Sequence, residues 1–394
     1  MRLRHVLFAA ASPLCLLAGA AQAETVISTT VATPVATATA ANGARDDVKI
    51  STAGTIQPTS AGAAVTLNSN NTVTNEGTIK FSNVNDATGI LGLGGMTGTI
   101  KHAGTMTIDE TTEIKDTDGD GDLDGPFATG ARRYGIRVTG PGAFHGDVIQ
   151  SGGSITIEGN DSAGISVETA IDGSIRTAGA IAVTGSNGFG VHSASTVGGD
   201  VAIRSSVVAQ GEGAVAVATD DNIGGKLILG GAISSTGFRY TSRGTDAAVA
   251  KLDADDLLIG GPAVRVRGDV FGGVVVDAAP ADNDKNNADE DGDGVADASQ
   301  TAGAVTSLGS APAMLIGSDT RAIRLGVGGT GVSAYGLNIK GSAQALGIYD
   351  GISATAVQLG GLGGGVTIDG GVRVSGAVSA TAVKAGAMGL RLGA

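Results

Sequence analysis

The sequence predicts an all-β fold, a right-handed parallel β-helix in which short strands stack along one axis. A weak unit of roughly 23 to 29 residues recurs from about Asn85 to Ser379, a period typical of stacked supersecondary repeats. Gly is 67 of the 394 residues, aromatic residues are 3% and Trp is absent, which disfavours an ordinary helical or α/β domain. The apolar residues are mostly Val, Ile and Ala, and these small or β-branched side chains suit stacked strands.

The repeat can be read directly from the chain. Tyr134-Gly-Ile-Arg-Val returns as Ala163-Gly-Ile-Ser-Val and then as Phe189-Gly-Val. Between these segments, Gly153-Ser-Ile-Thr-Ile returns as Gly179-Ala-Ile-Ala-Val, with the aliphatic residues on one face of an alternating strand. Such units bury their apolar face only against neighbouring units, so we expect two or three strands per coil with Gly or Asn at the corners. A β-propeller would need about 40 residues per blade and collagen needs Gly at every third position, and neither pattern is present.

The first 23 residues are predicted to be a secretory signal peptide. Arg2 and Arg4 supply the positive start, a short apolar centre follows, and Ala21-Gln22-Ala23 is a small-residue cleavage motif. The apolar centre is too short to remain as a membrane-spanning helix. Cys15 is the only cysteine, so cleavage after Ala23 leaves a mature chain that can form no disulfide bond.

The rest of the chain divides into a leader and a repeat region. Residues 24–60 are rich in Thr, Ala and Ser and are expected to be an extended leader or a capping segment. The repeat region is expected to cover 61–394 and to carry insertions at 113–134, 238–258 and 278–312. Because the three insertions fall at the same place in the repeat unit, we expect all of them at one corner of the β-helix. Only residues 246–258 have apolar spacing that suggests a helix.

The negative charge of the chain is concentrated in two places. Loss of the two signal-peptide arginines leaves 23 of the 25 basic residues against 38 acidic ones, a net charge of −15. Residues 116–124 carry five acids, and residues 282–297 carry seven acids with one lysine. An acidic chain without a basic stripe or stacking aromatics is a poor candidate for nucleic-acid binding, so we expect no nucleic-acid partner.

The two acidic blocks share one spacing. Asp116-Thr-Asp-Gly-Asp-Gly-Asp-Leu-Asp124 and Asp289-Glu-Asp-Gly-Asp-Gly-Val-Ala-Asp297 both contain D-x-D-x-D-G. Oxygens at positions 1, 3, 5 and 9 can surround a hard cation, and Gly at position 6 permits the sharp turn. The candidate metal ligands are therefore Asp116, Asp118, Asp120, Asp124, Asp289, Asp291, Asp293 and Asp297.

Both loops resemble the aspartate-rich calcium repeats of the thrombospondin type 3 kind and the first half of an EF-hand loop. The resemblance covers about nine residues in each loop and implies calcium as the bound ion. A complete EF-hand is not expected, because position 12 holds Phe127 or Gln300 instead of Glu and no amphipathic helices flank the loops. A solvated acidic loop without a metal is the alternative, although carboxylates this close repel each other unless a cation or solvent screens them.

No motif predicts catalysis, so we expect that the protein is not an enzyme. The histidines are scattered, and no nucleophile elbow or phosphate-binding loop is present. Stacked carboxylates could serve a polysaccharide-active enzyme as acid and base, and three Gly-Asp pairs are expected at equivalent positions: Gly146-Asp147, Gly199-Asp200 and Gly268-Asp269. Asp beside Gly is also a common turn pair, and we favour that interpretation.

The chain as a whole resembles the passenger region of a bacterial type V autotransporter. A secretory signal, a Thr-, Ala- and Ser-rich start and a cysteine-free, glycine-rich β-helix carry this resemblance, without a single diagnostic motif. It implies Sec export, followed by secretion or display at the outer membrane, and a role in adhesion or another surface interaction. The final residues, Gly389 to Ala394, lack the aromatic-girdled strands of a translocator barrel, so we expect a fragment whose barrel is encoded downstream.

Two functions of different classes remain open at this point. The preferred one is a surface-displayed or secreted structural or adhesin-like protein with calcium-binding loops. The alternative is a secreted β-helical lyase or glycoside hydrolase that acts on polysaccharides. The sequence identifies neither the surface ligand, which could be a host or matrix glycan, nor the oligomeric state.

Overall fold

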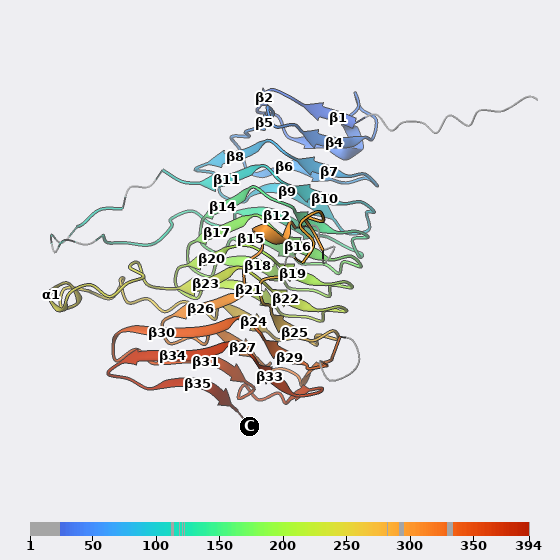
Figure 1. The fold of residues 1–394 in the computed structure, drawn as a ribbon. Coiled ribbons are helices and arrows are strands. Elements are labelled where there is room, and N and C mark those ends of the chain that lie inside the picture. Colours follow the sequence, from blue (N-terminus) through green and yellow to red (C-terminus); the bar gives the residue numbers. More distant parts are fainter. Residues whose placement is uncertain are drawn as a thin grey trace, which may run out of the picture.

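The computed structural model describes residues 24–393 apart from 112–113, 118, 120, 122, 282, 291–294 and 329–333. These residues form a parallel β-helix (Figure 1). Each coil contributes one strand to each of three sheets, and each sheet contains 11 strands in chain order. The predicted all-β architecture of stacked parallel strands is confirmed. Residues 1–23, the predicted signal peptide, lie outside the described part of the chain.

The strands are named in chain order and grouped by sheet. Sheet A contains β1 (Glu24–Ile27), β4 (Asp47–Ile50), β7 (Val73–Asn75), β10 (Ile100–His102), β13 (Val148–Gln150), β16 (Ile175–Thr177), β19 (Val201–Ile203), β22 (Leu227–Leu229), β25 (Val274–Val276), β29 (Leu337–Ile339) and β33 (Val372–Val374). Sheet B contains β2 (Thr30–Val31), β5 (Thr55–Ile56), β8 (Thr78–Ser82), β11 (Thr105–Asp109), β14 (Ser154–Glu158), β17 (Ala180–Thr184), β20 (Val207–Gln210), β23 (Ala232–Thr236), β26 (Ala304–Leu308), β30 (Ser342–Asp350) and β34 (Ala377–Val383). Sheet C contains β3 (Val35–Ala36), β6 (Gly62–Leu67), β9 (Ala87–Leu93), β12 (Tyr134–Thr139), β15 (Ala163–Val167), β18 (Phe189–Ser193), β21 (Val215–Thr219), β24 (Val264–Val266), β27 (Met314–Ile316), β31 (Ala354–Leu359) and β35 (Ala387–Leu392). The remaining elements are the pair β28 (Ile323–Leu325) and β32 (Val366–Ile368), the short helix α1 (Asp246–Val249) and the 3-10 turns η1 (Thr37–Thr39) and η2 (Asp297–Ser299).

Successive coils stack in register, so equivalent residues lie directly over one another. Ile175 pairs with Val201 and Val201 pairs with Leu227, which gives a spacing of 26 residues in this part of the helix. The inward residues of each strand are aliphatic and almost fully buried, as at Ile155 and Ile181 in sheet B. Because each coil covers the apolar face of the previous one, burial of Val, Ile and Leu drives the stacking.

Glycine, asparagine and aspartate occupy positions that the close packing and the turns of the β-helix require. Gly164 lies in sheet C where a Cβ atom would come within 2.5 Å of Ile181 Cγ2, so its lack of a side chain lets sheets B and C approach each other. At the corner between these sheets, Asp161 and Asn187 have φ angles of 50° and 55°. Short polar side chains tolerate this left-handed conformation, and Asn187 also donates a hydrogen bond to Asp161 at 3.1 Å.

The Thr-, Ala- and Ser-rich segment 24–60 belongs to the β-helix itself. Strands β1 to β5 lie within this segment and pair in parallel with later strands. For example, Thr25 of β1 pairs with Val48 of β4 in sheet A. The segment therefore forms the first coil and part of the second. In the first coil, none of the residues of β1, β2 and β3 is fully buried, so these strands do not require large aliphatic side chains.

The three predicted insertions interrupt the coils, and two of them leave the same corner. Insertion one (residues 110–133) joins β11 to β12, and insertion two (residues 237–263) joins β23 to β24, so both lie between sheets B and C. Both project from the same side of the β-helix (Figure 1). Within insertion two, helix α1 covers only Asp246–Val249, which is much shorter than the helical pattern of 246–258 suggested.

The third insertion corrects the prediction of a single corner. Insertion three (residues 277–303) joins β25 to β26, so it lies between sheets A and B. The predicted block 278–312 contains β26, whose inward residues are Val305 and Ser307. One aliphatic residue and one serine give only a weak alternating pattern, and the strand was therefore not distinguished from the insertion. As a result, the insertions border both long edges of sheet B.

Candidate functional site

The first aspartate loop, residues 116–124, is the outer part of insertion one. The carboxylate of Asp116 accepts hydrogen bonds from the backbone N–H of Gly119 at 2.6 Å and of Gly121 at 3.1 Å. At the other end, Asp124 Oδ2 accepts the backbone N–H of Thr117 and also its hydroxyl at 2.7 Å. The loop is thus closed on itself by its first and last aspartates, and Asp118 and Asp120 lie outside the described residues.

The second aspartate loop, residues 289–297, closes in the same way. Asp297 Oδ2 accepts the backbone N–H of Glu290 at 3.1 Å, which repeats the bond from Thr117 to Asp124 at the same loop positions. Asp297 also begins the turn η2 and is only 6% exposed. Its second oxygen, Oδ1, is buried and has no hydrogen-bond partner in the described part of the chain.

The structure does not bring the two loops together into one site. Loop one extends from the corner between sheets B and C, whereas loop two belongs to insertion three at the corner between sheets A and B. Asp289 is half-buried at the start of loop two, and Asp291 and Asp293 lie outside the described residues. Each loop is therefore a separate candidate cation site.

Insertion two adds acidic groups to loop one that the sequence analysis did not identify. One carboxylate oxygen each from Asp124, Asp253 and Asp255 lie within 4.8 Å of one another. A side-chain hydrogen bond between Asp253 and Asp255 raises the pKa of Asp253 and lowers that of Asp255. The acid-rich run Asp253-Ala-Asp-Asp256 was visible in the sequence, but nothing local indicated that it lies beside loop one.

Insertions one and two are joined by several contacts between residues more than 100 positions apart. The backbone N–H of Gly125 donates to Asp255 Oδ2 at 2.6 Å, and that of Leu123 donates to the hydroxyl of Tyr240 at 3.2 Å. Arg239 donates to the carbonyl of Gly125 at 2.6 Å and lies over the ring of Phe127 at 4.9 Å. These contacts hold loop one against insertion two. Insertion one leaves the β-helix at the fourth coil and insertion two at the eighth, so the two insertions meet outside the coils that separate them.

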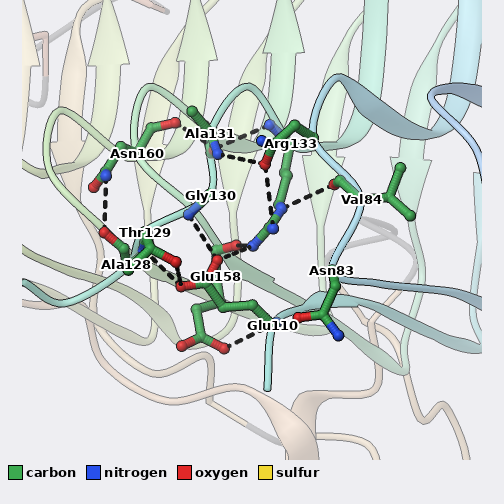
Figure 2. A network of polar contacts seen from close by, with 12 residues as sticks. Asn83, Val84, Glu110, Ala128, Thr129, Gly130, Ala131, Arg133, Glu158 and Asn160 are labelled. Carbon is green, nitrogen blue, oxygen red and sulfur yellow. Dashed lines mark hydrogen bonds and ion pairs between the residues drawn. The ribbon is translucent and has the colours of Figure 1, made fainter. Parts of the chain in front are cut away.

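A buried ion pair fixes the base of insertion one, as Figure 2 shows. Arg133 Nη1 lies 2.9 Å from Glu110 Oε2, and the two side chains are 2% and 3% exposed. Glu110 also accepts the backbone N–H groups of Thr129 at 2.6 Å and of Gly130 at 2.7 Å. Burial alone would raise the pKa of Glu110, but these hydrogen bonds together with the one from Arg133 lower it below its usual range.

A pocket of about 590 Å³ lies beside the contact between insertions one and two. It is lined by Gly121, Tyr240, Ser242, Gly244, Ala247, Ala248, Val249, Lys251, Leu252 and Tyr349. Two tyrosine rings and the small residues of α1 form most of its walls, so the pocket can accommodate an apolar or aromatic group.

The Gly-Asp pairs have a structural role in the turns between coils. Asp147 Oδ1 accepts the backbone N–H of Ser174 at 2.7 Å, and Asp200 Oδ1 accepts that of Lys226 at 2.7 Å, so each carboxylate binds the next coil. Asp269 is not at the equivalent position, because its neighbour Val270 pairs with Ile223 instead of with the sheet A column. These contacts agree with the interpretation of Asp beside Gly as a turn pair.

Comparisons of the chain with protein-family models, with curated proteins and with solved structures give no match. In the described part of the chain, no helix has the length and apolar character needed to cross a membrane. The arguments about function therefore rest on the fold and on the geometry of the loops.

Proposed function

We propose that this protein is a secreted or surface-displayed β-helical scaffold with a structural or adhesin-like role, and that its aspartate loops bind calcium. The stacked coils supply a long rigid body, and insertions at both edges of sheet B supply irregular surface suited to recognition. Secretion and display rest on the signal-peptide pattern and on the resemblance to autotransporter passengers.

The observation that carries the calcium proposal is the buried carboxylate of Asp297. Burial of a carboxylate oxygen without a hydrogen-bond partner costs roughly several kcal/mol, as for other buried polar groups. A cation or a proton bound to the oxygen compensates this cost. Asp297 is 6% exposed, and its Oδ1 atom lacks such a partner among the described residues. It ends a D-x-D-x-D-G loop whose other aspartates offer further oxygen ligands. Calcium is the cation that such an oxygen-only set favours.

The identical closure of the two loops supports the same proposal for loop one. In both loops the backbone N–H at position 2 donates to the carboxylate at position 9. In loop one, Asp116 also orders the backbone N–H groups of Gly119 and Gly121. These bonds draw both ends of the loop inward, so a cation would meet ligands that are already close together.

Calorimetric titration of the purified protein with calcium tests this proposal. We expect two sites per chain, of which Asp116→Asn removes one and Asp297→Asn removes the other. Asp319→Asn is the matched control, because it removes the same charge from an exposed residue outside both loops. Absence of binding at millimolar calcium, or full binding in both loop variants, would contradict the proposal. Robust cleavage of a polysaccharide by the same preparation would contradict the scaffold role.

A further inference from the structure

A column of polar residues lies inside the β-helix, beside the aliphatic column of sheet A that contains Val73, Ile100, Val148 and Ile175. Asn75, His102, Gln150 and Thr177 are paired in register on four successive strands of sheet A. All four side chains are 0% to 1% exposed. The same column continues as Ile50 on one side and as Ile203 on the other. The polar column is therefore a local interruption of the hydrophobic core in the third to sixth coils.

The hydrogen bonds around His102 fit only its neutral form. Asn75 Oδ1 accepts the backbone N–H of Gly77 at 3.1 Å, which leaves the amide Nδ2 of Asn75 to face His102 Nδ1 at 3.0 Å. An amide NH₂ group is a donor, so Nδ1 must accept and carries no proton. On the other side of the ring, Nε2 lies 3.1 Å from the carbonyl of Ser154, which can only accept, so Nε2 carries the proton.

A second proton on His102 has no compensating partner in this environment. It would place an N–H group of His102 against the NH₂ group of Asn75, so two donors would face each other. The neighbouring strands β7 and β13 present Asn75 and Gln150 to the ring, and β14 presents the Ser154 carbonyl. The charged residues of the sheet A strands around the ring are Asp47 and Lys49 in β4, Lys101 in β10 and Arg176 in β16, and they alternate to the outer face of the sheet. In sheet B, Asp109 of β11 and Glu158 of β14 also stand at outward positions. Burial lowers the pKa of His102, against an opposing hydrogen bond to Ser154.

The rest of the column is itself incompletely satisfied. Gln150 Nε2 donates to the carbonyl of Ala180 at 3.2 Å, but Gln150 Oε1 has no hydrogen-bond partner in the described part of the chain, and neither does Thr177 Oγ1. Each buried polar atom without a partner lowers local stability. In a solenoid, coils open locally because each one is held mainly by its neighbours. These coils are therefore sensitive to one further unfavourable change.

We propose that His102 makes the N-terminal part of the β-helix acid-sensitive: protonation at Nδ1 breaks the bond from Asn75 and opens β7, β10 and β13, while the central coils stay closed. This inference is independent of calcium binding. The direction follows from linkage. Because the folded coil favours neutral His102, stability is fully present above the ordinary histidine pKa of 6.5 and is lost as the pH falls below it. Each pH unit below 6.5 increases local opening up to about tenfold, until the folded protein itself binds the proton.

Hydrogen exchange measured by mass spectrometry at pH 7.5, 6.5 and 5.5 tests the proposal. After correction for intrinsic exchange rates, we expect protection of β7, β10 and β13 to fall about fivefold to tenfold between pH 6.5 and 5.5, while protection of β21 stays constant. His102→Gln, which repeats the neutral side chain of Gln150, should abolish this dependence. His145→Gln is the control, because the His145 side chain is 50% exposed and pairs with Asp172.

The proposal is overturned if protection in β10 does not change with pH, or if His102→Gln retains the dependence of the native protein. If His102→Gln does not fold, NMR of the native protein decides the question. The ring of His102 should remain neutral as the pH falls below 6.5, and its signals should broaden or shift together with those of β7 and β13. Reversible titration of His102 near 6.5 without any change in exchange would also overturn it.

Discussion

Arg133 and Glu110 form a buried ion pair at the point where insertion one leaves and rejoins the β-helix, with Nη1 and Oε2 2.9 Å apart. Arg133 also donates through Nε to the carbonyl of Val84 at 3.0 Å and through Nη1 to that of Glu158. The pair therefore connects the third, fourth and fifth coils to the base of the insertion (Figure 2). Its burial makes each partner dependent on the other.

Loss of one partner of this pair should be strongly destabilising. We expect Arg133→Met to lower the free energy of unfolding by about 3 to 5 kcal/mol, because Glu110 would remain buried without a counter-charge. Urea denaturation measures the loss. The neighbouring Arg132→Met is a close control, since Arg132 and Asp86 are 57% and 52% exposed and such pairs contribute about 0 to 1 kcal/mol. Equal losses in the two variants would show that burial of the pair does not matter.

The contacts between insertions one and two predict a local effect at loop one. We expect Arg239→Gln to increase hydrogen exchange and proteolysis across residues 114–130, because it removes the bond to Gly125 and the contact with Phe127. The sheets should be unaffected. Arg243→Gln serves as the control, because Arg243 contacts Asp246 and Asp350 instead of insertion one. A variant whose loop one stays as protected as in the native protein would refute the joining role of Arg239.

The close packing between sheets B and C predicts that one added methyl group lowers the stability of the fold. In Gly164→Ala the new Cβ atom would lie 2.5 Å from Ile181 Cγ2 and 2.7 Å from the carbonyl of Gly190. We expect a loss of about 1 to 3 kcal/mol in the free energy of unfolding, the usual effect of overpacking a core. Gly152→Ala is the comparison, because no atom lies within 4 Å of that site, and a loss there as large as at Gly164 would contradict the packing argument.

The acid dependence of Asp220 can be predicted with its sign. Burial alone would raise the pKa of Asp220, but hydrogen bonds from His192 and Arg265 and the charge of Arg265 lower it to about 2. The stability that Asp220 contributes is therefore fully present above its ordinary pKa of 3.8 and is lost as the pH falls toward about 2.

NMR titration of the Asp220 carboxyl measures this pKa directly. We expect a midpoint near 2 in the native protein, as the shift caused by these partners predicts. His192→Gln should raise the midpoint, because Asp220 then loses the bond that His192 makes at 2.9 Å. His145→Gln should leave it unchanged. A midpoint at the ordinary value of 3.8 in the native protein would contradict the role of both partners.

The sequence was sufficient to predict stacked parallel strands, because the repeat itself specifies which residues face inward. Ile155 and Ile157 lie inside as their alternation indicates. The sequence was not sufficient to predict β26, because Ser307 stands there in place of an aliphatic inward residue. It was also not sufficient to predict the polar column at His102, because polar inward residues interrupt the pattern that identifies a strand. Strand identity depends on local periodicity, and these segments have little of it.

The aspartate loops were recognisable because their residues are adjacent in sequence. The approach of Asp253 and Asp255 to Asp124 could not be recognised in the sequence. It depends on how far the insertions from the fourth and eighth coils extend away from the β-helix. The pair of Arg133 and Glu110 is also separated by the whole of insertion one. Contacts of this kind follow from the completed fold, and a local motif does not specify them.

Terbium luminescence tests the central claim, that the aspartate loops bind calcium, most directly. Trp is absent from the chain, so tyrosine is the main side chain that can sensitise a terbium ion in a calcium site. The hydroxyl of Tyr240 accepts the backbone N–H of Leu123 inside loop one at 3.2 Å. We expect sensitised emission that calcium displaces, that Asp116→Asn removes from loop one, and that Tyr240→Phe weakens while Tyr134→Phe does not. Absence of emission from the native protein, or emission that is unchanged in Asp116→Asn and Tyr240→Phe, would contradict calcium binding at loop one.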